Sequence, residues 1–134
     1  MIGRIIGAVV VMAALTACQT MIGNAQNQPL QSLAGTEWGF PNYPYNQFIA
    51  FNPNGEVNGN GGCNGFFGSF TQMGPQLTFG PIASTRRACQ EPLNSAERGF
   101  FDVLNRTRTV NATNRELVLF GDQGEVLAVL TRRR

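Results

Sequence analysis

The sequence contains no histidine and no lysine. Without histidine the chain lacks the commonest general base, the commonest metal ligand and any nucleophile that works through a Ser–His or Cys–His pair. Three cysteines without histidine also cannot supply the usual ligand set of a zinc site. We therefore expect no catalytic residue, no metal site and no cofactor. A glycosidase-type pair among the acidic residues stays open, because a sequence does not show which carboxylates flank a cleft.

Charged residues are scarce, at 13% of the chain, and the formal net charge is only +2. Nucleic-acid binding needs a strongly basic surface, so this balance predicts no nucleic-acid partner. The 134 residues correspond to a single domain, and a hydrophobic fraction of 43% is ordinary for a globular protein. A chain of this length can bury a modest core.

Long hydrophobic runs are limited to the start of the chain, where Arg4 precedes an apolar run from Ile5 to Leu15. At about eleven residues this run is too short to span a bilayer comfortably, and its pattern is typical of a signal peptide. It ends in Leu15-Thr16-Ala17-Cys18, which resembles the bacterial lipobox. The resemblance implies a lipoprotein signal peptide over residues 1–17, with lipid attached to Cys18. An ordinary secretory signal and a short uncleaved anchor are the alternatives.

The residues after Cys18 are expected to form a flexible tether, residues 18–33. They are rich in Gln and Asn and show no sustained apolar period. In Gram-negative lipoproteins an Asp directly after the lipidated cysteine favours the inner membrane, so Gln19 implies the outer membrane by resemblance. We therefore expect a lipid-anchored protein at the cell outer membrane, facing the periplasm. A multiply acylated cysteine anchors stably, whereas a single chain binds only marginally.

The remainder of the chain shows turn residues every eight to twelve positions, the spacing of an antiparallel β domain. Pro53-Asn54-Gly55 predicts a hairpin turn, because Asn and Gly tolerate positive φ. The expected strands are residues 36–40, 47–51, 56–60, 66–71, 77–79, 116–120 and 125–131. The fold class is therefore mainly β.

One segment has a helical period. Asn94 or Ser95 can begin a helix, and Glu97 follows Asn94 at the spacing of a capping box. Phe100 and Leu104 then lie on one face of a helix that we expect to end near residue 105. That apolar face should cover one opening or one face of the sheet, which brings the fold close to α+β.

Two cysteines, Cys63 and Cys89, remain after lipidation of Cys18. An exported protein enters an oxidising compartment, so an even remainder predicts one disulfide. The bridge would stabilise the domain by roughly 3–4 kcal/mol in the chain-entropy model. A redox pair is the alternative, although the sequence has no C-x-x-C spacing.

Three further segments carry weaker hypotheses. The run Gly59–Gly65 is interpreted as a bulged or sharply bent strand, with an anion cradle as the alternative. Arg86 and Arg87 are expected in a solvated loop, unless they form an acid-binding patch. Arg132–Arg134 are expected to form a frayed terminus, unless they contact an anionic lipid or polymer.

Several blocks of the sequence together resemble a known family. The pattern is similar to the META domain of HslJ-type proteins, and it covers nearly all of the chain from Leu33 to the end. The blocks that carry it are Leu33-Ala34-Gly35-Thr36-Glu37-Trp38, Gly62-Cys63-Asn64-Gly65, Thr85-Arg86-Arg87-Ala88-Cys89 and Leu117-Val118-Leu119. Arg87 is a departure, because members often carry Met there. The resemblance implies a META domain over residues 34–134 with a compact, antiparallel, barrel-like β fold and a helix.

The resemblance also sets the functional expectation. Members are often envelope lipoproteins linked to stress responses, and the family supplies no agreed enzyme activity, cofactor or catalytic residue. We expect a monomeric, non-enzymatic lipoprotein that acts as a stress-related binding or assembly module. It would contact the membrane through lipid on Cys18 and could bind another envelope protein. A periplasmic inhibitor or chaperone-like docking protein is the alternative, followed by a carrier of a small apolar ligand at a barrel mouth.

Overall fold

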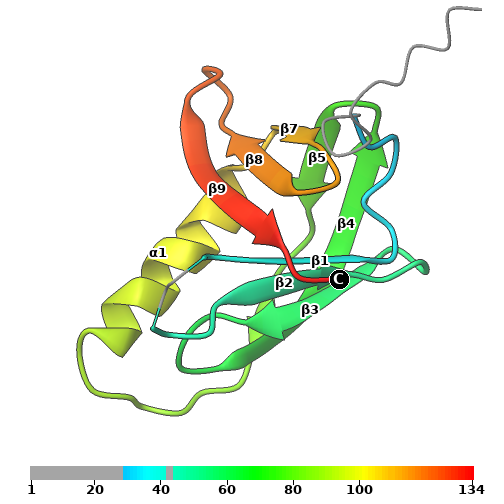
Figure 1. Ribbon diagram of the computed structural model, residues 1–134. Helices are drawn as coiled ribbons and strands as arrows, with labels where there is room; N and C mark the ends of the chain where they lie inside the picture. Colours follow the sequence, from blue (N-terminus) through cyan, green and yellow to red (C-terminus); the bar gives the residue numbers. More distant parts are fainter. Residues whose placement is uncertain (1–28, 42–43) are drawn as a thin grey trace, which may run out of the picture.

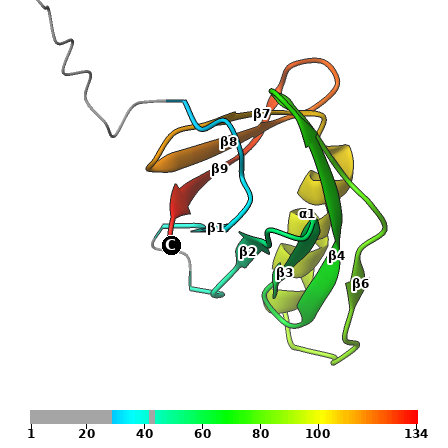
Figure 2. The ribbon, with the colours of Figure 1, turned by 90° about the vertical axis from the view of Figure 1, so that its right-hand side faces the viewer.

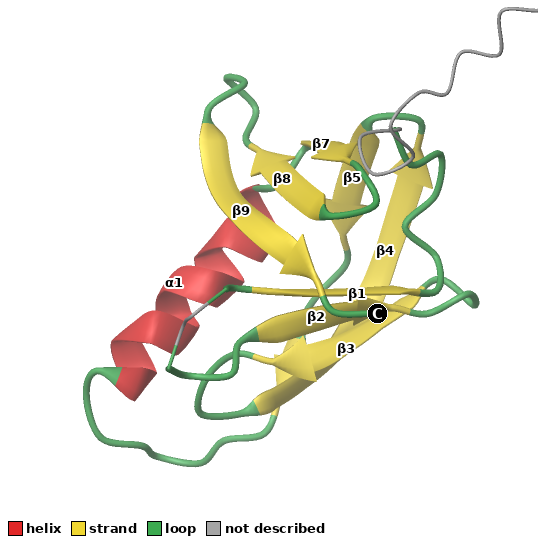
Figure 3. Ribbon diagram, in the orientation of Figure 1, coloured by secondary structure: helices red, strands yellow, loops and turns green. Residues whose placement is uncertain are grey.

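The computed structural model describes residues 29–41 and 44–134. The predicted signal peptide and Cys18 lie outside these residues. The described part contains nine strands and one helix (Figures 1 and 3). They are β1 (Thr36–Gly39), β2 (Phe48–Phe51), β3 (Glu56–Asn60), β4 (Gly65–Met73), β5 (Gln76–Phe79), β6 (Ala83–Ser84), α1 (Leu93–Arg106), β7 (Thr109–Ala112), β8 (Glu116–Phe120) and β9 (Val126–Arg132).

The strands form one antiparallel sheet in the order β3-β2-β1-β9-β8-β7-β5-β4-β6. A further pairing between β3 and β4 closes eight of the strands into a ring. The ninth strand, β6, pairs with the start of β4, at Phe66 and Phe67. Two joints in this ring are short. β5 meets β7 through Gln76 and Thr109, and β1 meets β9 through two residue pairs. The mainly β, barrel-like fold predicted with one covering helix is confirmed.

Helix α1 and the N-terminal segment lie on opposite sides of the ring (Figures 1 and 2). From α1, Phe100 and Leu104 enter the core, as their spacing predicted. From the other side, Leu33 is fully buried, and the N–H of Leu30 donates to the carbonyl oxygen of Ala112 over 2.9 Å. Residues 30–33 therefore belong to the domain, although we assigned them to the tether. Leu33 is buried because it packs against core residues that are distant in the sequence. The local sequence around Leu33 does not reveal these contacts.

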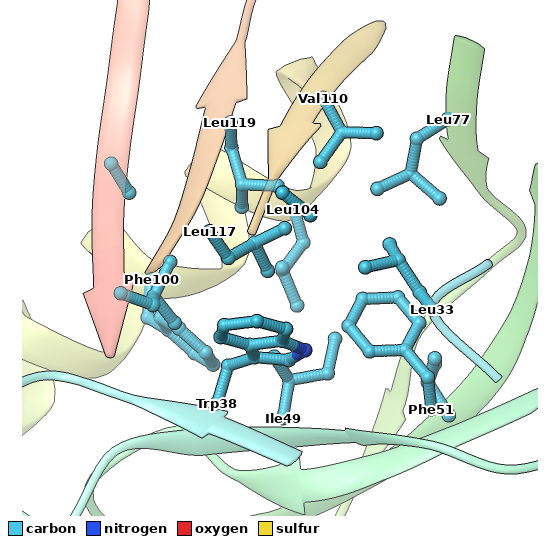
Figure 4. Packing of buried hydrophobic residues seen from close by; sticks show 14 of the residues in the cluster. Leu33, Trp38, Ile49, Phe51, Leu77, Phe100, Leu104, Val110, Leu117 and Leu119 are labelled. Atoms are coloured by element: carbon cyan, nitrogen blue, oxygen red, sulfur yellow. The ribbon is translucent and has the colours of Figure 1, made fainter. Parts of the chain in front are cut away.

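The core gathers aliphatic and aromatic side chains from nearly every strand and from α1 (Figure 4). Trp38 is its largest buried side chain, and its indole N–H donates to Thr36 Oγ1 over 2.6 Å. The Thr36 hydroxyl donates in turn to the carbonyl oxygen of Leu33. Burial of these polar atoms is thus compensated, as burial of Trp and Thr requires. The chain of bonds fixes the N-terminal segment against β1.

The hairpin turns follow the sequence signals closely. The predicted turn at Asn54-Gly55 joins β2 to β3, and Gly55 adopts a φ of 85° that favours glycine. The strands predicted at residues 56–60 and 116–120 form with the same bounds. Two strands, β6 and β7, escaped prediction. β7 is only four residues long, and its inward pair, Val110 and Ala112, is too short a pattern to distinguish from a loop.

The start of α1 differs from the prediction. The N-cap is Pro92, and no side chain caps the helix there. The prediction of a capping box between Asn94 and Glu97 is therefore wrong, because both side chains form hydrogen bonds outside the helix instead. Asn94 Oδ1 accepts from the N–H of Cys89 over 3.3 Å, and Glu97 binds the turn between β3 and β4. One free N–H of the first turn, that of Ser95, instead donates to the carboxylate of Glu91 over 3.1 Å.

Replacing Gly99 with alanine is expected to stabilise the protein by about 0.5–1 kcal/mol, because glycine inside a helix costs conformational entropy. Gly99 lies on the exposed side of α1, and a Cβ there meets no atom within 4 Å. Chemical denaturation of Gly99→Ala beside the wild type measures the gain. A destabilised variant would contradict the open space that the structure shows at this position.

Candidate functional site

The most elaborate polar structure in the molecule surrounds the turn between β3 and β4, residues 61–64. Cys63 in this turn is disulfide-bonded to Cys89, with their Cα atoms 5.9 Å apart. The disulfide is the one that the cysteine count predicted. It links the turn to the loop before α1, and Cys63 itself is buried.

Glu97 of α1 places a buried carboxylate against the same turn. Glu97 Oε2 accepts from the main-chain N–H groups of Cys63 and Asn64 over 3.0 and 2.5 Å, and Oε1 accepts from Asn64 Nδ2 over 2.8 Å. A Cβ at Gly61 would lie 2.9 Å from Glu97 Cγ, so glycine is required for this approach. The run 59–65 is thus the end of β3, a tight turn over residues 61–64 and the start of β4, not a bulged or sharply bent strand. It does cradle an anion, and that anion is a side chain of the protein.

Asn64 connects this carboxylate to the loop that follows β6. Its Oδ1 accepts from the Thr85 hydroxyl and from the N–H of Arg87, over 3.0 and 2.7 Å. Its Nδ2 donates to Glu97 and also to the carbonyl oxygen of Arg87. Because oxygen and nitrogen each have two partners, the amide has one orientation only. Asn64 therefore holds the turn, α1 and the loop at residues 85–87 together.

Gln47 adds a second buried amide to the same region. Its Nε2 donates to the carbonyl oxygens of Gly61 and Ala96 over 2.7 and 2.9 Å. The start of β2 is thereby tied both to the turn and to α1. Within the described residues no buried side-chain nitrogen or oxygen lacks a partner. These polar groups are consequently committed to holding the chain in place.

The two arginines beside Cys89 have different environments. Arg86 is exposed, as expected of a solvated loop. The Arg87 guanidinium donates to the carbonyl oxygen of Cys63 over 3.1 Å. Arg87 is exposed in the loop as predicted, and its guanidinium additionally holds the disulfide-linked turn.

The C-terminal arginines are docked on β1, which contradicts the expectation of a frayed terminus. The N–H of Arg133 donates to the carbonyl oxygen of Glu37 over 2.7 Å, and the N–H of Glu37 donates to the carbonyl oxygen of Arg134 over 3.1 Å. The Arg132 guanidinium lies 5.2 Å from the ring centre of Trp38, and that of Arg133 lies 4.4 Å from Phe48. Stacking and main-chain pairing together hold the last residues of the chain.

Most acidic side chains outside this region take part in surface contacts. Hydrogen bonds from the side chain and then the main chain of Ser95, together with the charge of Arg98, hold the pKa of Glu91 below its ordinary value. Other carboxylates pair with Arg106 or Arg133 at 3.2–3.6 Å. Residues 29–41 and 44–134 contain no group of three or more Cys, Asp or Glu side chains that could hold a metal ion. No helix among them is both long and apolar enough to cross a bilayer.

Two hollows in the surface are bounded mainly by apolar side chains. One, of about 380 Å³, lies where the described chain begins and is lined by Pro29, Leu30, Pro75 and Val110 among others. The second, of about 320 Å³, runs between α1 and β9 and includes Phe40, Gly99 and Leu127 in its lining. Both hollows are open at the surface, and neither is an enclosed apolar cavity.

The sequence profile of the META domain matches residues 29–134. The chain belongs to the META domain family. The match begins at Pro29, in agreement with the packing of residues 30–33 on this META domain. A search of curated proteins gives no match.

Two solved structures share the fold of this META domain. One is an NMR structure of a protein from Burkholderia xenovorans, with a TM-score of 0.63, 20% identity and coverage of 75% of this chain and 83% of that chain. A second NMR structure has a TM-score of 0.53 and 22% identity, and covers 75% of this chain and 90% of that chain. At these identities the likeness concerns the fold alone.

Sequence reasoning identified the cysteine pair but missed the residues that organise it. In the sequence Asn64 is only part of a block shared with the family, and Glu97 stands at the spacing of a helix cap. Gln47 was treated as a strand residue. A buried amide or carboxylate reveals itself only through partners distant in the sequence, here 14 to 49 residues away. The one local signal is the cluster of glycines, which allows a turn to approach another element closely.

Proposed function

We propose that this META protein is an envelope lipoprotein whose domain is a non-enzymatic binding or assembly module, held at the outer membrane by lipid on Cys18. The stress-related role follows from the resemblance to HslJ-type proteins. The observation that carries the proposal is the disulfide between Cys63 and Cys89. Disulfides persist in oxidising compartments, and a leader that resembles a lipobox provides the route to one.

The internal use of the polar groups supports a non-enzymatic role. The carboxylate of Glu97 and the amides of Asn64 and Gln47 bind main-chain groups or one another. Groups engaged in this way rigidify a fold and have little capacity left for a substrate. A rigid domain on a lipid anchor is suited to presenting a surface to other envelope components.

Replacing Cys18 with alanine is expected to abolish membrane anchoring, because the thiol that would carry the lipid is removed. Fractionation of cells into membrane and soluble parts, with the intact mass of the extracted protein, measures the effect. The wild type should have the mass of residues 18–134 plus lipid. Thr20→Ala, two residues further along, is the matched control and should remain anchored. Normal anchoring of the Cys18→Ala variant would contradict the proposal.

A further inference from the structure

One edge of β9 has no strand partner over most of its length. β1 pairs with β9 only through Trp38 with Arg132 and Gly39 with Thr131. Within the described chain, no strand pairs with this edge between Val126 and Leu130. Figure 1 shows β9 diverging from β1, with α1 behind the place where the two strands separate. The ring is therefore joined here at the C-terminal end of β9 alone, and the rest of this edge is without a strand partner among the described residues.

The open edge presents main-chain hydrogen-bonding groups. The N–H of Arg132 donates toward β8, to the carbonyl oxygen of Arg115 over 2.9 Å. Successive residues of an antiparallel strand direct these groups to alternate sides, so those of Val129 point away from β8. Val129 itself is 44% exposed. An unpaired N–H and C=O on an exposed strand form a template for another strand.

The apolar groove described above adjoins this edge. Its walls are β9, through Leu127, and α1, through Ala96, Gly99 and Val103, and it ends at Phe40. Since Gly99 has no side chain, the wall formed by α1 is recessed there. The helix satisfies its own main-chain groups, so β9 is the wall that can offer main-chain hydrogen bonds to an occupant, beside the polar side chains of Gln47 and Ser95. The groove thus combines apolar lining on both sides with a strand edge on one.

The two ends of the groove differ in charge. A hollow of about 300 Å³ adjoins it at Phe40 and is lined by Arg132 and Arg133; Arg133 pairs with Glu37 over 3.4 Å, so one positive charge is in excess there. Near the start of β9, Arg106 is shared between Asp102 and Glu125, at 3.2 and 3.6 Å, which leaves one excess negative charge. Opposite charges at the two ends would orient an extended ligand and suppress the reverse direction.

We propose that an extended peptide segment of an envelope protein adds as a strand to the open edge of β9. Its apolar side chains would occupy the groove against α1, and an acidic residue at one end would lie beside Arg132 and Arg133. Strand addition draws affinity from main-chain hydrogen bonds and specificity from pockets for alternate side chains. An acyl chain would fill the apolar part but leave the groups of Val129 without partners. The inference rests on the binding role proposed above, and it does not depend on the lipid anchor.

Random ten-residue peptides displayed on phage, selected against the processed chain in detergent, test the proposal. Enriched sequences are expected to alternate apolar residues and to carry Asp or Glu at one end. Fluorescence anisotropy with the synthetic peptides should show at least a tenfold loss of affinity for Val129→Pro, which removes the edge N–H without breaking the pairing with β8. Gly99→Leu should reduce affinity similarly by filling the groove, whereas Gly99→Ala is the matched control.

Peptides N-methylated at alternate residues provide an independent arm that needs no variant, because they keep the side chains and lose the main-chain donors. Their affinity should fall at least tenfold in one of the two methylation patterns. The proposal would be overturned if every selected peptide also bound the Val129→Pro variant. It would also be overturned if methylated and unmethylated peptides bound with the same affinity. A lipid retained in native mass spectra and lost in Gly99→Leu would assign the groove to an amphiphile instead. A dimer lost in Val129→Pro would assign the edge to a second copy. None of these results bears on whether Cys18 anchors the protein.

Discussion

Replacing Cys63 and Cys89 together with serine is expected to lower the free energy of unfolding by about 3–4 kcal/mol, since the bridge closes a loop of 26 residues. Much of that loss reflects the greater entropy of the unfolded chain. The native state loses less, because Asn64, Arg87 and Glu97 still hold the turn through hydrogen bonds. Denaturant unfolding of the double variant and the wild type measures the difference.

This expectation has a clear thermal counterpart. In a domain of this size a loss of about 3 kcal/mol lowers Tm by roughly 12–20 °C. Wild-type protein treated with a reductant should approach the double variant, while the reductant should leave the variant itself unchanged. Equal melting temperatures for oxidised protein, reduced protein and variant would show that the disulfide does not stabilise the domain.

The parts of the fold that the sequence predicted are those whose signals are local. Glu56–Asn60 and Glu116–Phe120 are bounded by turn residues and alternate in burial, so both strands form where expected. The hairpin at Asn54-Gly55 depends on a backbone conformation that glycine favours. Phe100 and Leu104 share a helix face because of the 3.6-residue period alone. In each case neighbours along the chain contain the whole reason for the structure.

The errors occur where a distant partner decides. Leu33 follows a polar segment and resembles part of a tether, yet its side chain is fully buried in the core at one side of the ring. Arg133 and Arg134 look like a solvated tail, yet the main chain of Glu37 in β1 pairs with them. Local composition favoured the disordered alternative at both ends. Tertiary contacts override it because each segment covers a part of the sheet that would otherwise be open.

The open edge of β9 could not be predicted either. It arises because β1 ends at Gly39 while β9 continues along β8. A sequence does not show where one strand ends relative to the strand that pairs with it. The cysteine pair, in contrast, followed from a count, because assigning Cys18 to the predicted lipid anchor leaves only two thiols for pairing. The candidate site was thus half predictable: the covalent bond was, and the hydrogen bonds that surround it were not.

Replacing Glu97 with alanine is expected to cost about 3 kcal/mol or more, because two main-chain N–H groups and the amide of Asn64 would lose their acceptor in a buried site. Glu97→Gln should cost less, about 1.5–3 kcal/mol, since its oxygen still accepts from the turn. Its new NH₂ group would face Asn64 Nδ2, and Asn64 cannot reverse without losing Thr85 and Arg87.

The matched control is Glu91→Ala, which removes an exposed carboxylate from the start of the same helix and should cost far less than Glu97→Ala. Because Glu97 and Asn64 are in direct contact, the double variant Glu97→Ala/Asn64→Ala should be less destabilised than the sum of the single variants by about 0.5–3 kcal/mol. Denaturant unfolding of the four proteins completes the cycle. Strict additivity would mean that the two side chains stabilise the turn independently, and that the carboxylate is not the centre on which turn, loop and helix converge.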